Sequence, residues 1–281
     1  MIRNPPPSTA AEGLGLRRLT DAVAQIVSHA ARIVMGFYET QFETRRKADQ
    51  TPVTCADLAA HELLAEGLAA LEPGVAVLSE EGEIPPPGQR RRWRSHWLVD
   101  PLDGTRGFAA RNGEFTINVA LVSEGRPLLG VVAVPVTGTC YAAARGGGAW
   151  LQHADGVREV IRTRRLGAQQ VVVLRSRTRR HADVDRLVAK LGQVRVLVAS
   201  SSLKACLVAR GLADLYPAFG PTSEWDTAAG QCIVEAAGGG MTDLALNPLR
   251  YNQSDSLENP NFIAFGDPRV DWRSLVAEFN S

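Results

Sequence analysis

The chain has 281 residues, of which 45% are hydrophobic and 22% charged, a composition typical of a soluble globular protein with one large domain or two packed subdomains. Its formal net charge of +1 at pH 7 excludes a general polyanion binder, which needs a clear excess of basic residues, although a small anionic substrate stays compatible with it. No stretch reaches the roughly 18 apolar residues of a membrane-spanning helix, and the four cysteines lie too far apart for a zinc or dithiol site, which favours a reducing cytoplasm.

The first 71 residues predict a leader followed by two helices. Residues 1–15 include three consecutive prolines and are expected to form a disordered leader. Apolar residues spaced three and four apart predict a long amphipathic helix over residues 16–39. A second helix is expected from about residue 56 to residue 71, because Pro73 and Gly74 follow that point.

A mostly antiparallel sheet is predicted next. Short apolar strands at 75–78 and 97–99 flank a surface loop at 84–94, which is rich in proline and arginine. Three further strands are separated by turn sequences and form a meander, over residues 115–122, 128–135 and 139–144. The three glycines at 146–148 are expected to end this meander.

Helices and strands alternate in the second half of the chain. Strands are expected at 171–174, 195–198 and 214–217, and helices at 183–191, 203–210 and 226–237. The fold class is therefore α+β (mixed α/β), with a meander-rich first half and an alternating second half. We expect one domain over residues 16–281, with subdomains at about 16–165 and 166–281.

Two carboxylates three residues apart, Asp100 and Asp103, follow a predicted strand in the sequence D-P-L-D-G-T. A turn after a strand points into the crevice where α/β folds bind ligands, and two carboxylates held together favour a hard cation with oxygen ligands. Gly104 allows close approach of the backbone to an oxyanion, and Thr105 supplies a hydroxyl. The alternative is an Asx turn with no metal.

Four other acids stand at the predicted ends of strands and helices. Glu80 and Glu81 end a strand, where the alternative is a solvated loop. Asp57 and Asp226 each stand near the start of a helix, where the simplest role is an N-cap. Capping does not prevent the second carboxylate oxygen from binding a metal.

Three of these acidic segments, taken together, resemble the inositol-monophosphatase superfamily. Their order and rough spacing also match, so the resemblance covers most of the chain, from about residue 57 to residue 240. The matching segments are L-S-E-E at 78–81, W-L-V-D-P-L-D-G-T at 97–105 and W-D-T-A-A-G at 225–230.

Finer features resemble one branch of this superfamily, the 3'(2'),5'-bisphosphate nucleotidases. Two departures from that branch are Ser200, where glycine is common, and a longer tail after Phe262. Neither departure changes one of the acidic residues. The segments that carry this resemblance are K-A-D-Q-T-P-V-T at 47–54, R-N-G-E-F-T-I-N at 111–118, S-S-L-K-A-C-L-V-A at 201–209 and P-A-F-G-P-T at 217–222.

The resemblance implies a layered αβαβα sandwich and two or more Mg²⁺ ions, with no other cofactor. One ion is expected to bind Glu80, Asp100 and the carbonyl of Leu102. A second ion is expected to bind Asp100, Asp103 and Asp226, so that Asp100 bridges the two. Such a pair would clamp a phosphate oxygen.

Catalysis and substrate binding are assigned in the same way. By resemblance, Asp57 and Thr105 form the relay that takes a proton from the attacking water. Lys204 is expected to hold a second, uncleaved phosphate, with a solvated lysine as the alternative. The substrate-binding residues are expected to be Asp103, Gly104, Thr105, Ser201, Lys204 and Asp226.

The resemblance implies a lithium-sensitive enzyme that hydrolyses adenosine 3',5'-bisphosphate to AMP and phosphate and supports sulfur assimilation. One alternative is an inositol or sugar monophosphatase on the same core. Another is a non-catalytic protein that binds RNA or a partner through the arginine runs at 90–94 and 175–180, which the intact acids disfavour. We expect a cytoplasmic monomer or homodimer with a small nucleotide substrate, no nucleic-acid partner and no integral membrane segment. Attachment to the inner face of the membrane stays open.

Overall fold

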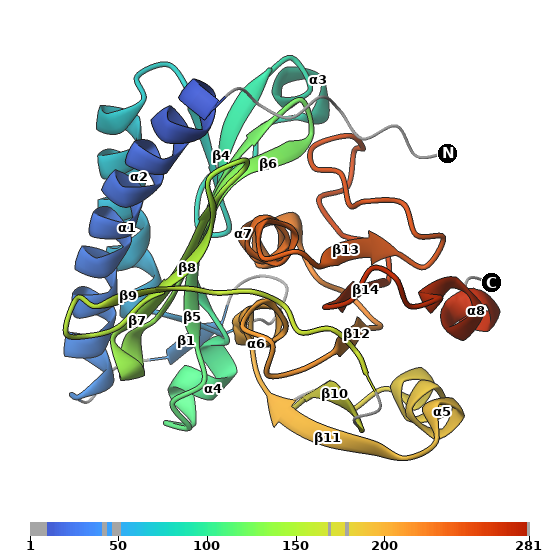
Figure 1. Ribbon diagram of the computed structural model, residues 1–281. Coiled ribbons are helices and arrows are strands. Elements are labelled where there is room, and N and C mark those ends of the chain that lie inside the picture. Colours follow the sequence, from blue (N-terminus) through green and yellow to red (C-terminus); the bar gives the residue numbers. More distant parts are fainter. Residues whose placement is uncertain (1–9, 41–43, 47–51, 168–169, 178–179, 280–281) are drawn as a thin grey trace.

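Helices and sheets alternate in layers through the protein (Figure 1). The computed structural model describes residues 10–40, 44–46, 52–167, 170–177 and 180–279. Over these residues the two larger sheets are separated by a middle layer of helices and covered by helices on their outer faces. This arrangement confirms the mixed α+β class and the αβαβα sandwich. In layer order, the helices are α1 (Ala10–Tyr38) and α2 (Cys55–Leu71), α6 (Leu203–Ala209) and α7 (Glu224–Ala236), and α5 (Ala182–Leu191) and α8 (Trp272–Val276).

The larger sheet has seven strands within the described residues, in the order β3-β4-β5-β6-β7-β8-β9. β3 and β4 run parallel, and the later pairs are antiparallel. The prediction that glycines end the meander is wrong, because Gly146 and Gly148 turn the chain back into β8. The strands are β3 (Ala76–Ser79), β4 (Ser95–Asp103), β5 (Thr116–Ser123), β6 (Arg126–Val134), β7 (Thr139–Ala144), β8 (Gly148–Gln152) and β9 (Arg158–Val160).

The smaller sheet has five strands in the part of the chain that the structure describes, in the order β11-β10-β12-β14-β13. β10 lies parallel to both β11 and β12, which fits the predicted alternation of strand and helix. β13 and β14 add an antiparallel edge that the sequence did not indicate. The strands are β10 (Val171–Ser176), β11 (Val194–Ala199), β12 (Leu215–Ala218), β13 (Gly240–Asp243) and β14 (Phe262–Phe265).

Several short elements differ from the predictions. α1 begins at Ala10, so the last residues of the predicted leader are helical. The loop at 84–94 contains the helix α3 (Pro87–Arg90), and Arg90 is buried rather than solvated, donating to Asn252 Oδ1 at 2.7 Å. Within the described residues, every helix lacks either the length or the apolar character that a membrane span requires. The other short elements are β1 (Thr44–Arg46), β2 (Pro52–Thr54), α4 (Thr105–Ala109), η1 (Pro135–Thr137) and η2 (Ala277–Phe279).

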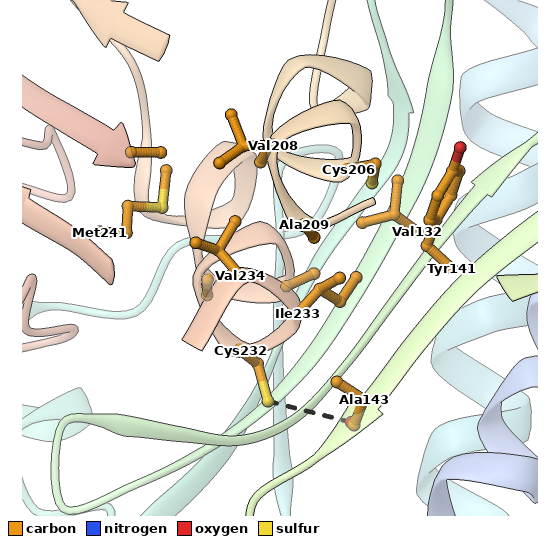
Figure 2. Close-up of a cluster of buried hydrophobic side chains, with 14 of the residues drawn as sticks. Val132, Tyr141, Ala143, Cys206, Val208, Ala209, Cys232, Ile233, Val234 and Met241 are labelled. Carbon is orange, nitrogen blue, oxygen red and sulfur yellow. Dashed lines mark hydrogen bonds between the residues drawn. The ribbon is translucent and has the colours of Figure 1, made fainter. Parts of the chain in front are cut away.

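The middle core joins the two sheets through α6 and α7. Figure 2 shows side chains of both helices packed against Val132 and Tyr141 of the larger sheet, with Met241 of the smaller sheet on the other side. Cys232 Sγ lies 3.9 Å from the carbonyl oxygen of Ala143. Burial of this kind is the main stabilising contribution to the fold, and it fixes α7 against the strands that carry the candidate site.

Gly130 allows α7 to approach β6 closely. A Cβ atom at this position would lie 2.5 Å from the carbonyl oxygen of Ala229 in α7. Because that carbonyl belongs to the packed backbone of α7, Gly130→Ala is expected to lower the free energy of unfolding by about 1–3 kcal/mol in urea denaturation. The matched control is Gly36→Ala in α1, where a Cβ meets open space and the helix should gain up to about 1 kcal/mol. Equal effects of the two substitutions would contradict this packing.

Candidate active site

A β-bulge at the end of β4 places Asp100 and Asp103 on the same side of the sheet. Asp100 pairs with Asn118 of β5 and Asp103 pairs with Thr116, so β4 has one residue more than β5 between these two pairs. Residues three apart on a regular strand face opposite sides, and the extra residue cancels that difference. The strand predicted at 97–99 is therefore too short, because β4 continues through Pro101 as a bulge.

Three carboxylates meet beside this bulge. Glu80, Asp100 and Asp226 each offer one oxygen, and these oxygens lie within 4.8 Å of one another. They come from three elements: Glu80 follows β3, Asp100 belongs to β4 and Asp226 stands in the first turn of α7. The backbone N–H of Glu80 donates to the carbonyl oxygen of Val99 (3.1 Å), which aligns the ends of the two parallel strands.

Two aspartates are held by capping boxes at helix starts. Thr54 is the N-cap of α2 and Ser223 is the N-cap of α7, while Asp57 and Asp226 each occupy the N3 position. The expectation that both aspartates stand at the N-cap is wrong, because each stands three residues later, at N3. In each box the aspartate accepts from the N-cap backbone N–H, at 2.8 Å for Asp57 and 2.9 Å for Asp226. Each carboxylate keeps its other oxygen for the site.

The acid cluster is unfavourable without a cation. Burial raises the pKa of Asp100 well above its ordinary value, and repulsion from Glu80 raises it further. Burial and the nearby charge of Asp103 raise the pKa of Asp226 to about 8. Buried carboxylates that repel one another are the oxygen-donor set that binds hard divalent cations, so these residues fit such an ion.

Asp103 lies in the same pocket but directs one oxygen elsewhere. Its Oδ2 accepts from the backbone N–H of Ser202 (2.7 Å) and lies 2.9 Å from the Ser202 hydroxyl. That hydroxyl also lies 2.7 Å from the carbonyl oxygen of Asp226. Asp103 is therefore outside the tight group of three oxygens, and Ser202 ties it to the first turn of α7.

A hydroxyl relay borders the acid cluster. Thr105 Oγ1 lies 3.3 Å from Asp57 Oδ1 and 3.2 Å from the carbonyl oxygen of Leu102. The Leu102 N–H in turn donates to Asp100 Oδ1 at 3.0 Å. Asp57 is buried, which raises the pKa of its carboxyl group. The structure thus brings the predicted pair Asp57 and Thr105 into contact.

Glycine is required where β4 turns into α4. Gly104 has φ = 97°, and a Cβ atom there would lie 3.1 Å from the carbonyl oxygen of Glu114. Its backbone lines the same pocket as Asp100 and Thr105. The expected close approach of this backbone to an oxyanion stays a prediction.

A pocket of about 360 Å³ extends from the acids toward the smaller sheet. Its lining combines the carboxylates with Lys204 and with several aromatic and apolar side chains. Tyr216, Phe219, Met241 and Phe262 are among these aromatic and apolar residues. The pocket therefore offers carboxylates, a cation and flat apolar surface together.

Lys204 is buried and does not behave as a solvated lysine. Only 5% of it is exposed. Its Nζ donates to the carbonyl oxygen of Ser201 at 2.8 Å and lies 4.9 Å from the centre of the Tyr216 ring. Ser201 has a positive φ of 52°, and its buried hydroxyl has no hydrogen-bond partner among the described residues. A cation and an unpaired hydroxyl thus face one pocket.

The sequence missed several residues of the site. Ser202 adjoins the predicted Ser201, but nothing in the sequence distinguished their roles. Glu114 and Arg177 form a two-pronged ion pair at 2.6 and 2.8 Å that joins the two halves of the chain beside the pocket. The arginine run at 175–180 was the available signal for it. Of the segment 47–54, residues 47–51 lie outside the described residues.

Known proteins resemble this chain along most of its length. The sequence pattern of the inositol monophosphatase family matches residues 16–269. The 3'(2'),5'-bisphosphate nucleotidase CysQ of Escherichia coli (strain K12) is 45% identical over 248 residues, covering 87% of this chain and 98% of that protein. The same-named protein of Haemophilus influenzae is 36% identical over 263 residues, covering 93% and 97%.

Solved structures agree with these sequence matches. The crystal structure of CysQ from Bacteroides thetaiotaomicron, described as a bacterial member of the inositol monophosphatase family, superimposes with a TM-score of 0.79. It is 36% identical and covers 90% of this chain and 98% of that one. With the pattern match over residues 16–269, these likenesses show that the chain belongs to the inositol monophosphatase family.

Proposed function

We propose that this phosphatase removes the 3'-phosphate of adenosine 3',5'-bisphosphate and releases AMP and phosphate. The observation that carries the proposal is the shared pocket, which is lined by both the acid cluster and the buried Lys204. Such a pocket suits a substrate whose two anionic groups are joined by a part that can pack against aromatic side chains. The related proteins named 3'(2'),5'-bisphosphate nucleotidase support the same substrate class. By resemblance, the reaction would serve sulfur assimilation.

The acid cluster fits Mg²⁺, a hard cation that prefers oxygen ligands. Glu80, Asp100, the carbonyl of Leu102, Asp103 and Asp226 would hold two or more such ions. Asp103 would do so through Oδ1, since Oδ2 accepts from Ser202. When bound, such ions supply Lewis-acid chemistry that neutralises phosphate charge and acidifies water.

Thr105 and Asp57 would handle the proton of the attacking water. Thr105 Oγ1 would accept that proton while passing its own toward Asp57 Oδ1, 3.3 Å away. Two donors from Thr54, its N–H and its hydroxyl at 2.8 and 2.5 Å, hold Asp57 Oδ2 and fix the direction of its other oxygen. A base positioned in this way typically contributes about 10²- to 10⁴-fold to the rate. The Gly104 and Thr105 backbone would receive phosphate oxygens.

Recognition of the second phosphate would use Lys204 and Ser201. The Lys204 ammonium carries a positive charge and lines the pocket, and its contacts include the Ser201 carbonyl oxygen and the Tyr216 ring. An anionic group could therefore bind there with a charge-assisted hydrogen bond. The flat side chains of Tyr216 and Phe219 line the pocket nearby and suit a nucleoside rather than a cyclitol.

A direct test is phosphate release from adenosine 3',5'-bisphosphate, measured with Mg²⁺ and with EDTA. Release with Mg²⁺ that EDTA abolishes is the expected result. Absence of release under both conditions, by protein whose folding is verified by circular dichroism, would overturn the proposed activity.

The metal-free protein is expected to lose stability as the pH rises from about 5 to 8. The folded pKa of Asp226 is raised to about 8, so the folded state holds a proton that the unfolded state releases near its ordinary pKa of 3.8. The stabilising contribution is complete below that lower value and is lost as the pH approaches 8, at no more than about 1.4 kcal/mol per pH unit per proton.

This loss is measurable by urea denaturation in EDTA across that pH range. Asp226→Asn removes the titrating group and keeps an oxygen that can accept from Ser223, so its pH dependence should be shallower. A variant and wild type with the same slope would contradict the prediction.

Millimolar Li⁺ is expected to inhibit the enzyme, as its family resemblance implies. A small hard cation can occupy a Mg²⁺ position without supplying the same charge. The measurement is the rate of phosphate release in LiCl against KCl at equal concentration. Equal rates in the two salts would count against a Mg²⁺ site of this type.

A further inference from the structure

A second cavity lies at the opposite end of β4 from the acids. Its volume is about 380 Å³, and three segments line it: residues 91–94 with His96, the β5–β6 turn at 124–125 and residues 250–253. His96 and Asp100 are four residues apart on β4, which corresponds to about 13 Å along a strand. The cavity is therefore separate from the pocket described above, and none of the described residues lines both.

Arginine dominates the charge of this cavity. Arg91, Arg92, Arg94 and Arg250 line it, and Glu124 is the one carboxylate in its described lining. Arg94 pairs with Glu124 at 3.3 Å; both side chains are largely exposed, so that pair is weak and easily rearranged.

The remaining arginines are only partly neutralised. Arg91 pairs with exposed Asp255 outside the cavity lining at 2.5 Å. Arg250 donates to the carbonyl oxygen of Glu124 at 2.7 Å, and the structure gives neither Arg92 nor Arg250 an ion pair within the described residues.

Two more guanidinium groups reinforce the positive potential. Arg126 and Arg145 lie near enough to Arg250 that, after burial, their repulsion lowers its pKa. Glu235, a solvent-exposed residue, offsets part of the charge of these two, and Gln231 donates to it at 2.8 Å. Like charges gathered in this way favour an anion.

A buried polar side chain without a partner borders the same space. His96 is 2% exposed, and neither ring nitrogen has a hydrogen-bond partner among the described residues. Burial, with the nearby charge of Arg90, lowers the pKa of His96 to about 4, so the ring is neutral at pH 7 and carries one N–H. Buried donors are normally paired, and this one lines a cavity that could hold an acceptor.

We propose that this cavity binds a small tetrahedral oxyanion, sulfate or the phosphate group of a small ester. Arg92 and Arg250 supply guanidinium donors from two sides, and His96 supplies a neutral donor at the cavity wall. Planar guanidinium groups match the paired oxygens of such an anion. The volume suits a small molecule rather than a macromolecule.

The test is a calorimetric titration of the full chain with sodium sulfate in EDTA, against sodium chloride at equal ionic strength. The double variant Arg92→Gln/Arg250→Gln removes two cavity cations, and binding should weaken by at least about tenfold for the lost charge-assisted contacts. The matched control is Arg18→Gln/Arg195→Gln, which removes two exposed arginines outside the cavity and should bind as wild type does. A parallel titration with methyl phosphate distinguishes a phosphate ester from sulfate.

If sulfate bound only in the first pocket, both double variants would bind it as tightly as wild type does, and that outcome would overturn the proposal. Absence of saturable binding by wild type, as for a cavity that holds only water, would also overturn it. A second measurement does not depend on the arginine variants: sulfate should shift the ring ¹⁵N signals of His96, assigned through His96→Gln. Signals that stay in place through a saturating titration would contradict the site.

Discussion

Replacing Asp100 with asparagine is expected to lower kcat by about a thousandfold or more, or about 4 kcal/mol of transition-state stabilisation. Asp100 is 1% exposed, is one of the three carboxylates that meet in the cluster and is the proposed bridge between two cations. The neutral amide removes the charge that both positions need. Its oxygen can still accept from the Leu102 N–H, as Asp100 Oδ1 does at 3.0 Å, so the bulge should persist.

The folding of this variant provides an internal check. Removal of one of several repelling carboxylates should leave the metal-free protein at least as stable as wild type, in contrast to the loss of activity. Asp155→Asn, in the exposed turn between β8 and β9, is the matched control and should keep full activity. An Asp100→Asn enzyme with more than about a tenth of wild-type kcat, a loss below roughly 1.4 kcal/mol, would exclude the bridging role.

Replacing Lys204 with methionine is expected to separate recognition from chemistry. Methionine keeps most of the buried volume, whereas alanine would leave a cavity at a residue that is 5% exposed. Loss of a charge-assisted contact of about 1.5–3 kcal/mol should lower kcat/KM for adenosine 3',5'-bisphosphate by about 10- to 150-fold. Hydrolysis of 3'-AMP, which lacks the second phosphate, should change little.

Two comparisons make this result decisive. Lys190→Met in α5 removes a partly exposed lysine outside the pocket and should leave both substrates unaffected. If Lys204→Met lowered kcat/KM by the same factor for both substrates, the lysine would belong to the part of the site that both substrates use. No change for either substrate would remove it from recognition altogether.

Local patterns predicted the elements that depend on near neighbours in the sequence. The long helices and the meander followed from apolar spacing and turn residues. The D-P-L-D-G-T sequence pointed to an acidic turn, and Asp100 indeed meets Glu80 and Asp226. The capping boxes T-x-x-D and S-x-x-D were also visible as patterns, and they would have placed Asp57 and Asp226 at N3.

Features that depend on tertiary packing could not be predicted in this way. The bulge at Asp100 requires the register of β4 against β5, which no single strand specifies. Burial of Lys204 and Arg90 follows from contacts with Tyr216 and with Asn252, 12 and 162 positions away along the chain. Charged residues are usually exposed, so composition alone favours the solvated interpretation that the structure overturns.

The most direct test of the proposed specificity is a comparison of kcat/KM for adenosine 3',5'-bisphosphate and inositol 1-phosphate with the same enzyme and Mg²⁺ concentration. Both esters require the acid cluster, but only the nucleotide can also engage Lys204 and the aromatic wall. We expect the nucleotide to be preferred by at least about tenfold, the smallest factor assigned to the Lys204 contact. An equal or higher kcat/KM for inositol 1-phosphate would contradict nucleotide specificity and identify the enzyme as an inositol monophosphatase.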